Sequence, residues 1–334
     1  MINYAVIGTS MISGQFIKSA QATNEWDLTV LYSRSVEKAE HFLTAEELAF
    51  VPIETNWNAF LGDDRFSTVY IASPNSLHFQ QAIALLQAKK NIVVEKPIFP
   101  TAAEVVTAQK IAKENGVFIF EAARHIHEEN FKVVKDLLGN SPEIEGATFA
   151  YSKYSSRYDQ VLNGEEPNIF TTKFAGGALV DLGIYLVYSA VAWFGVPDQA
   201  HYFAKKISTG VDGSGTIILQ YPSFNVTLLT GKIIQSYLPS EIYTNTTTIK
   251  LDAVNAITDI AVWHRETNSE TQHAVAAPEL LLYDEALAFA SVINHPTDEQ
   301  ALARYAYWSE LSLQVTTLIE QLRQDAGIIY DAEK

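Results

Sequence analysis

The sequence predicts an α/β protein with two domains: an N-terminal doubly wound parallel sheet, and a C-terminal α+β domain built on a large, mostly antiparallel open sheet. Up to about residue 122, short apolar runs alternate with amphipathic helical segments, which is the pattern of consecutive βαβ units. Beyond that point, longer strand-like segments follow one another with few helices between them, which favours an antiparallel or mixed sheet. A chain of 334 residues exceeds one ordinary core, so we expect domains 1–122 and 123–334.

The first domain has five clear strand-like runs and one helix whose ends are both marked. The expected strands are residues 3–7, 28–32, 68–72, 91–94 and 117–120. Between the last two strands, Thr101 and Glu104 have the spacing of a capping box, and Gly116 stands where the helix should stop.

The second domain is expected to contain one early helix, a series of strands and two further helices. The helix covers 128–138, the strands cover 147–154, 215–221, 225–231 and 246–251, and the further helices cover 177–194 and 298–323. The last helix is long enough to pack back on the first domain.

The composition argues against nucleic-acid and membrane partners. The formal net charge is −16, from 39 acidic and 23 basic residues, which repels polyanions. The most apolar stretch, residues 184–196, is shorter than the ~20 residues of a membrane span, and the N-terminus has no basic segment before an apolar run. The chain has no cysteine, which excludes thiolate chemistry and disulfides. We therefore expect a cytoplasmic enzyme with a small-molecule substrate.

The first strand runs into a turn, residues 8–14, where a dinucleotide-binding fingerprint should lie. Serines replace the second and third glycines of that fingerprint, and a serine hydroxyl could donate to a phosphate oxygen at the helix N-terminus. This position predicts a Rossmann domain, although a plain strand-to-helix loop would use the same residue types. The residues expected to contact the cofactor phosphates are Gly8, Thr9, Ser10, Met11 and Ile12.

The end of the second strand indicates which cofactor binds. A carboxylate ~20 residues beyond the fingerprint would bind the ribose hydroxyl of NAD, but this position holds Ser33, followed by Arg34. A hydroxyl and a guanidinium suit a 2′-phosphate, and Lys38 is a possible second cation. We therefore expect NADP as the preferred cofactor, with NAD possible. The alternative is that Arg34 is only a solvated strand-end residue.

Three separated motifs resemble the Gfo/Idh/MocA family of oxidoreductases. They are Ser73-Pro74-Asn75 with His78 after the third long strand, Glu95-Lys96-Pro97 after the next strand, and residues 176–185, which contain Asp181 and Tyr185. The resemblance covers nearly the whole chain and is weakest over residues 155–172. It implies a Rossmann domain followed by a mostly antiparallel sheet, and a homodimer or homotetramer.

The resemblance also implies site residues. Lys96 matches the family's catalytic-site lysine. Many members carry Asp-x-x-x-His in the third motif, whereas this chain has Asp181-x-x-x-Tyr185, as in the glucose-fructose oxidoreductase and dihydrodiol dehydrogenase branches. By the resemblance, this tyrosine argues against a plain inositol dehydrogenase. Further cofactor contacts are expected from Ser73, Pro74, Asn75, His78, Glu95 and Lys96. For His78 we favour packing or a water contact over proton transfer.

The spacing of Asp181 and Tyr185 has its own chemical meaning. Four residues apart on a helix, they share one face and can approach one substrate. Hydride transfer from an alcohol carbon needs a group that accepts the hydroxyl proton, and a phenol with a pKa of ~10 needs a nearby cation for this task. Lys96 is the expected cation. The alternatives are that Tyr185 is a core aromatic and that Asp181 only bonds the backbone at the helix start.

The remaining candidates are two histidines. His125 and His127 follow the first domain where, by the resemblance, the chain passes the nicotinamide, and we favour reading them as surface histidines. No His-Glu-x-x-His or similar spacing is present, so we predict no metal. The main hypothesis is an NAD(P)-dependent oxidoreductase of a sugar, polyol or related compound. The alternative is a regulator of the same fold that senses dinucleotide and sugar without turnover.

Overall fold

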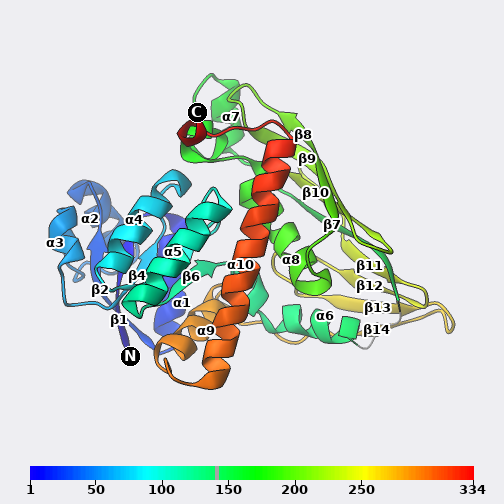
Figure 1. Ribbon diagram of the computed structural model, residues 1–334, viewed down its shortest axis with the longest axis horizontal. Helices are drawn as coiled ribbons and strands as arrows, with labels where there is room; N and C mark the ends of the chain where they lie inside the picture. The colour runs from blue at the N-terminus through cyan, green and yellow to red at the C-terminus, as the bar shows by residue number, and fades with distance from the viewer. Residues whose placement is uncertain (140–142) are drawn as a thin grey trace. The chain divides into compact units, whose positions relative to one another are not determined.

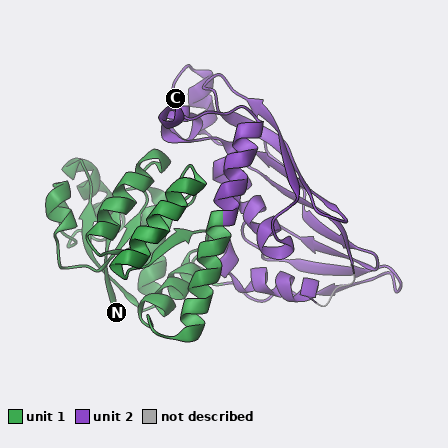
Figure 2. Ribbon diagram, in the orientation of Figure 1, with its two compact units in different colours: residues 1–124, 278–313 green, residues 125–277, 314–334 purple. Residues whose placement is uncertain are grey.

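The computed structural model describes residues 1–139 and 143–334, and these form two compact units (Figure 2). Unit 1 contains Met1–Arg124 and Pro278–Leu313, and unit 2 contains His125–Ala277 and Gln314–Lys334. The sequence predicts a second domain over residues 123–334, whereas residues 278–313 belong to the first unit. The physical reason is packing: Trp26 Nε1 donates to the Ala286 carbonyl at 3.0 Å, and the ring of Phe289 stacks on that of Phe120 at 4.7 Å.

Unit 1 is built on a six-stranded, fully parallel sheet with the order β3-β2-β1-β4-β5-β6. This is the strand order of the doubly wound dinucleotide-binding fold, which confirms the predicted fold class. The strands are β1 (Ile2–Ile7), β2 (Trp26–Tyr32), β3 (Ile53–Glu54), β4 (Thr68–Ile71), β5 (Asn91–Glu95) and β6 (Ile119–Ala122). The sequence analysis did not identify the two-residue strand β3.

Helices cover both faces of this sheet because alternate strand residues point to opposite sides. Along β1, Tyr4 and Val6 enter one core cluster, and Ala5 and Ile7 enter the other. The helices are α1 (Met11–Ala22), α2 (Val36–Ala45), α3 (Trp57–Leu61), α4 (Asn75–Gln87), α5 (Ala102–Asn115), α9 (Tyr283–Ile293) and the first part of α10 (Glu299–Asp325). Figure 1 shows them around the sheet.

The predicted ends of α5 are confirmed. Thr101 Oγ1 accepts from the Glu104 backbone N–H at 3.3 Å, and Glu104 Oε2 accepts from the Thr101 N–H at 3.1 Å. Gly116 ends the helix in the left-handed conformation, with φ of 67°. This reciprocal capping box fixes where the helix between β5 and β6 begins.

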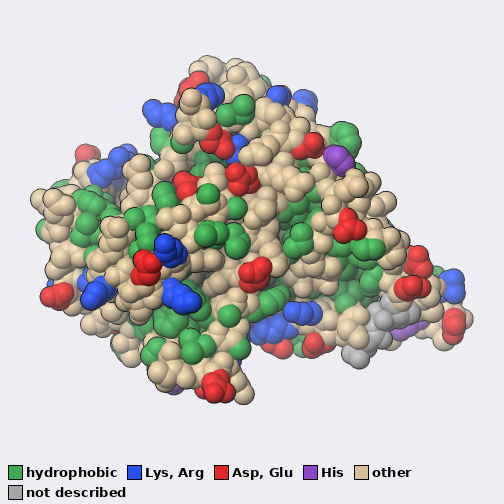
Figure 3. Space-filling model, viewed as in Figure 1, with side chains coloured by type: hydrophobic (Ala, Val, Ile, Leu, Met, Phe, Trp, Pro, Cys, Tyr) green, Lys and Arg blue, Asp and Glu red, His purple; other side chains and the backbone are tan. Residues whose placement is uncertain are grey.

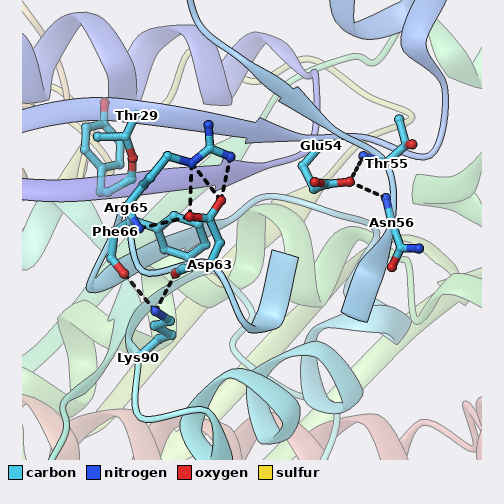
Figure 4. A network of polar contacts seen from close by, with 9 residues as sticks. Thr29, Glu54, Thr55, Asn56, Asp63, Arg65, Phe66 and Lys90 are labelled. Atoms are coloured by element: carbon cyan, nitrogen blue, oxygen red, sulfur yellow. Dashed lines mark hydrogen bonds and ion pairs between the residues drawn. The ribbon is translucent and has the colours of Figure 1, made fainter. Parts of the chain in front are cut away.

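A polar network fixes the loop between α3 and β4 (Figure 4). The Arg65 guanidinium donates to both Asp63 carboxylate oxygens at 2.6–3.0 Å and holds the pKa of that carboxyl below its usual range. The buried Lys90 ammonium donates to the carbonyls of Asp63 and Phe66 at 2.7 and 2.9 Å. These contacts anchor the amino ends of β4 and β5, opposite the carboxyl edge at which ligands bind in such sheets.

Unit 2 is built on an eight-stranded sheet with the order β14-β13-β12-β11-β7-β10-β9-β8. Strands β7 and β10 pair in parallel, and the other recorded pairs are antiparallel, which confirms the predicted mostly antiparallel sheet. The strands are β7 (Ile144–Ser152), β8 (Gln199–Lys206), β9 (Asp212–Gln220), β10 (Asn225–Gly231), β11 (Ser240–Thr244), β12 (Thr247–Leu251), β13 (Ile260–His264) and β14 (Ser269–Gln272).

The helices of unit 2 are α6 (Glu129–Gly139), α7 (Arg157–Leu162), α8 (Ile184–Phe194) and the end of α10, and α8 packs against β7 and β10. The expected helix over 177–194 differs at its start, because Leu179–Gly183 form a turn of π-helix, η4, before α8 begins. Residues Thr172–Phe194 are apolar enough for a membrane span, with hydropathy 1.6, but 78% of the most apolar window is buried inside the protein. This burial is typical of the core helix of a globular unit.

The charged side chains are dispersed on the face drawn in Figure 3. Blue Lys and Arg side chains alternate there with red Asp and Glu side chains and are not gathered in one basic patch.

Candidate active site

The turn between β1 and α1 is shaped by a close backbone approach at Gly8. Its φ is +109°, and a Cβ added there would lie 2.5 Å from the Ala72 carbonyl oxygen, so the turn needs glycine. Ser10 is the N-cap of α1, yet its hydroxyl lies 3.1 Å from that of Ser13 and does not cap the helix. A helix N-terminus of this kind suits a pyrophosphate.

A hollow of about 620 Å³ lies between this turn and helix α2. It is lined by Thr9, Glu37, Lys38, His41, Phe42 and Ala45. Thr9 and Lys38 were expected at the cofactor. Glu37 and His41 were missed, although their spacing of four residues after the Ser35 N-cap places them on one side of α2.

Ser33 and Arg34 lie at the start of the loop that leads into α2. The Ser33 hydroxyl donates to the Ser35 carbonyl at 2.9 Å and accepts from the Ser35 N–H at 3.2 Å. Ser35 Oγ in turn accepts from the backbone N–H of Lys38 at 3.3 Å, which caps α2. Arg34 is exposed. Ser33 therefore shapes the loop that presents Lys38 to the hollow.

His78 lies in the first turn of α4 and is fully buried. Its Nε2 is 2.8 Å from the Ser73 carbonyl, and its Nδ1 is 3.1 Å and 3.3 Å from the Pro97 and Ile98 carbonyls. Burial lowers the pKa of His78 and outweighs the opposing effect of these carbonyls, so we take the ring as neutral, donating to one of the two loops. The contacts favour the packing role over contact with solvent.

Three other residues of this motif, Ser73, Pro74 and Asn75, lie at the start of α4. Ser73 Oγ donates to Gln81 Oε1 at 2.7 Å, while Pro74 is the N-cap of α4 and Asn75 its first residue. The expected cofactor motif thus forms the start of α4, at the carboxyl edge of the parallel sheet where ligands bind in this fold.

Glu95 and Lys96 follow one another at the end of β5 but have different surroundings. Glu95 is buried and accepts a hydrogen bond from the Tyr70 hydroxyl. Burial raises the pKa of Glu95, against the opposing effects of Tyr70 and Lys96. Lys96 is half-buried and precedes a cis peptide bond to Pro97.

A second carboxylate, Glu121, holds the loop that follows Lys96. Glu121 Oε1 accepts from the Ile98 backbone N–H at 3.0 Å, and its Oε2 accepts from the Ser312 hydroxyl of α10. The role of Glu121 could not be predicted from local sequence, because its partner Ser312 lies 191 residues away in the chain. Contacts from β4, α4, β6 and α10 thus fix the backbone around Lys96.

In unit 2, Asp181 and Tyr185 lie across the junction between η4 and α8. Both side chains are half-buried, while Gly183, Ile184 and Leu186 around them are buried. The two residues therefore share the accessible side of this segment, as their spacing indicates. Their position at the rim of the core favours a ligand-facing role over a purely packed one.

The ring of Tyr185 is flanked by two further rings. The His125 ring centroid is 4.9 Å away and tilted by 58°, and the Tyr151 ring lies edge-on at 5.9 Å. The favoured interpretation of His125 and His127 as surface histidines is wrong, because they are only 1% and 4% exposed. Burial lowers the pKa of His127 to about 3. Local sequence could not reveal the burial of His125, because its ring packs against Tyr185 and Tyr188, which are distant in the chain.

Asp181 forms an ion pair with Lys232, a residue that the sequence analysis missed. Lys232 follows β10, 51 residues beyond Asp181, and no local spacing joins the two. The side chain of Lys232 is 2% exposed, and its Nζ lies 4.9 Å from the centroid of the Phe170 ring. A buried cation therefore supports the carboxylate beside Tyr185.

The two glycines before η4 are required by close packing. A Cβ on Gly176 would lie 2.6 Å from the Ile169 carbonyl, and a Cβ on Gly177, whose φ is +131°, would lie 2.1 Å from Asp212 Oδ1. Asp212 is buried and accepts from the Leu179 N–H and the Tyr202 hydroxyl, both at 2.6 Å. Burial raises the pKa of Asp212, while these bonds lower it. Asp212 thus fixes the first residue of η4.

Gly177→Ala is expected to destabilise unit 2 by ~3 kcal/mol or more, because the new methyl group would collide with Asp212 in a left-handed backbone. Gly116→Ala is the control for backbone strain alone: Gly116 ends α5 in the left-handed conformation with φ of 67°, and nothing lies within 4 Å of an added Cβ, so a loss of only ~1 kcal/mol is expected. Denaturant unfolding of both variants measures the difference. Equal losses would show that the contact with Asp212 is not what requires glycine.

The comparisons with known proteins agree with this architecture. The model of the oxidoreductase family with an NAD-binding Rossmann fold, GFO_IDH_MocA, matches residues 2–123. The chain is 34% identical over 333 residues to the uncharacterized oxidoreductase YgjR of Escherichia coli, covering 100% of this chain and 99% of the relative. It is also 34% identical to the scyllo-inositol 2-dehydrogenase (NADP⁺) of Bacillus subtilis, over the full length of both.

Solved structures share the fold. A 3-ketoreductase from Actinomadura kijaniata, solved with NADP and TDP-benzene, superposes with a TM-score of 0.83 at 22% identity, covering 98% of this chain and 99% of the other. The chain belongs to the Gfo/Idh/MocA family of oxidoreductases. It is an NAD(P)-dependent dehydrogenase or reductase that acts on CH–OH groups, and the resemblance seen in its motifs is confirmed.

Proposed function

We propose that this protein is an NADP-preferring oxidoreductase that transfers hydride between the nicotinamide and a sugar, polyol or related hydroxy or carbonyl compound. The observation that carries the proposal is the pair Asp181 and Tyr185, half-exposed on one side of the η4–α8 segment. The full-length similarity to a scyllo-inositol 2-dehydrogenase supports a polyhydroxylated substrate.

The cofactor fits the residues of unit 1. The turn at Gly8, where a Cβ would collide with the Ala72 carbonyl, leads directly into the N-terminus of α1, which suits the pyrophosphate, and the hollow beside Thr9 and Lys38 suits the phosphorylated ribose. When bound, the nicotinamide supplies the hydride acceptor or donor. The carboxyl edge of the parallel sheet, at Ser73 and Lys96, is where this fold binds such a ring.

Three side chains are assigned roles in binding the substrate and in moving its proton. Tyr185 accepts the proton of the reacting hydroxyl during oxidation and returns it to the carbonyl during reduction. Asp181 accepts hydrogen bonds from the substrate hydroxyls beside it, because its carboxylate is 36% exposed. Lys96 supplies the positive charge that favours the phenolate of Tyr185.

The preference for NADP has a direct test at Ser33. Ser33→Asp places a negative charge at the ribose end, and NADP affinity should fall ~10-fold or more through repulsion of the 2′-phosphate. The fold should tolerate the change, because a carboxylate can also accept from the Ser35 N–H. Thr44→Asp is the control, because it adds the same charge at an exposed position of α2 outside the hollow. Titration with both cofactors decides, and tighter binding of NAD than of NADP by the wild type would contradict this interpretation.

The reaction class is tested by following NADPH absorbance. The wild type is incubated with NADP and scyllo-inositol, other polyols and sugars, and in reverse with NADPH and dicarbonyl compounds. Turnover of a polyhydroxylated compound is expected. Tight cofactor binding without turnover of any compound would overturn the proposal in favour of a regulator that senses dinucleotide and sugar.

We also propose that the protein acts in the cytoplasm as a homodimer or homotetramer. Apolar side chains on three adjacent strands support this assembly: Phe203 on β8, Ile218 on β9 and Leu229 on β10 lie on one face of the sheet of unit 2 and are not buried, with Phe203 68% exposed. The acidic net charge of −16 supports an aqueous compartment without nucleic-acid or membrane partners.

A further inference from the structure

Lys232 is held by its backbone on both sides of the residue. Its N–H donates to the Gly213 carbonyl at 2.7 Å, and its own carbonyl accepts from the Ser155 N–H at 2.9 Å. These bonds connect the end of β10 to the start of β9 and to the chain after β7. The side chain therefore begins from a fixed point, and its long stem is buried rather than extended into solvent.

The ammonium group of Lys232 has a defined set of neighbours. It bonds Asp181 Oδ2 and lies 4.9 Å from the centre of the Phe170 ring, whose face attracts a cation. Asp212 is near enough for the charge of Lys232 to act on it, but its carboxylate already accepts from Leu179 and Tyr202. The ion pair with Asp181 therefore extends to the accessible side of the η4–α8 segment.

The energetics favour a positioning role for this ion pair. Moving an ammonium group from water into the interior costs several kcal/mol, and a buried ion pair often regains no more than this. Lys232 is 2% exposed and Asp181 36% exposed, so one partner is desolvated while the other faces solvent on one side. The pair adds little to the stability of the fold, but it limits the carboxylate to one orientation.

We propose that Lys232 is a positioning residue, which holds the Asp181 carboxylate where it accepts hydrogen bonds from substrate hydroxyls beside Tyr185. The inference rests on the proposed function. The ion pair limits the orientations of the partly exposed Asp181 side chain, and so fixes how its carboxylate meets a substrate. This arrangement favours neutral, polyhydroxylated substrates and disfavours anionic ones, which the Asp181 carboxylate would repel.

The experiment compares Lys232→Met, Asp181→Asn and the double variant, with Lys205→Met as the control for loss of an exposed lysine from the same sheet. In Lys232→Met, we expect KM for scyllo-inositol to rise ~10-fold while KM for NADP stays within about twofold. In the Asp181→Asn background, the same replacement should change kcat/KM by less than about threefold, because Lys232 acts through Asp181. A role in stability alone would lower the apparent kcat through loss of folded enzyme and leave both KM values unchanged.

A crystal structure of Lys232→Met with NADPH bound gives a readout that needs no turnover. We expect the Asp181 carboxylate to leave its position while the backbone of η4 is retained. An Asp181 carboxylate that keeps its position in Lys232→Met would overturn the inference. So would a loss of kcat/KM on Lys232→Met that is the same in the wild-type and Asp181→Asn backgrounds. If the wild type turns over no polyol, the proposed function fails, and the position of Asp181 in the crystal still decides whether Lys232 holds it.

Discussion

Tyr185→Phe is expected to lower kcat by ~10²- to 10⁴-fold, with cofactor binding and folding nearly unchanged. The variant loses one oxygen, which is the group assigned to proton transfer, and general acid–base groups contribute a factor of this size. The ring would keep its contacts with His125 and Tyr151, so the local packing is retained. Steady-state kinetics with any accepted substrate measures the effect.

Tyr188→Phe is the matched control for this change. Tyr188 lies on the same helix, three residues beyond Tyr185, and is only 1% exposed. Its replacement should leave kcat within about threefold of the wild type, because a buried phenol on this helix is not accessible to substrate. If Tyr185→Phe has the kcat of the wild type while hydride transfer limits the rate, the assignment of proton transfer to Tyr185 is wrong, and its role is packing.

Lys96→Met is expected to reduce kcat at least as strongly as Tyr185→Phe. Methionine keeps a stem of similar length but removes the cation to which we assign assistance of proton transfer by Tyr185. The loop should keep its shape, because Ile98 remains bonded to Glu121 and the Pro97 carbonyl lies against His78. Kinetic constants and the midpoint of thermal unfolding measure the two effects separately.

Lys110→Met controls for the loss of a lysine from unit 1. Lys110 lies on α5 with its side chain 74% exposed, and its ion pair with Glu114 spans 3.8 Å at the surface. Its replacement should change neither kcat nor stability measurably. A Lys96→Met variant that matched Lys110→Met in kcat would remove Lys96 from the proposed chemistry.

The sequence predicted those parts of the fold that local periodicity determines. Residues 225–231 form β10 with the expected bounds. The change near residue 122 from alternating strands and helices to consecutive strands separates a parallel sheet from a mostly antiparallel one. Strands β3, β8, β11, β13 and β14 were not among the expected strands; β3 has only two residues, and β14 is fully exposed and polar. The placement of 278–313 in unit 1 depends on tertiary packing, which no local pattern encodes.

In the candidate site too, the sequence predicted the residues that local patterns place. Gly8, Thr9 and Lys38 follow from the position of one turn and one helix relative to a parallel sheet. Lys232 and Glu121 could not be found, because each acts on a residue distant in the chain, and only the folded chain brings the partners together. The π-helical turn that carries Asp181 was also hidden, because its residues read as ordinary helix.

Single-turnover transfer of deuterium from carbon-deuterated scyllo-inositol to NADP tests the central claim most directly. The account predicts that the wild type forms deuterated NADPH, and that Tyr185→Phe does so ~10²- to 10⁴-fold more slowly while binding NADP with unchanged affinity. Absence of label in NADPH with every deuterated polyol, or equal transfer rates for the two proteins, would contradict it.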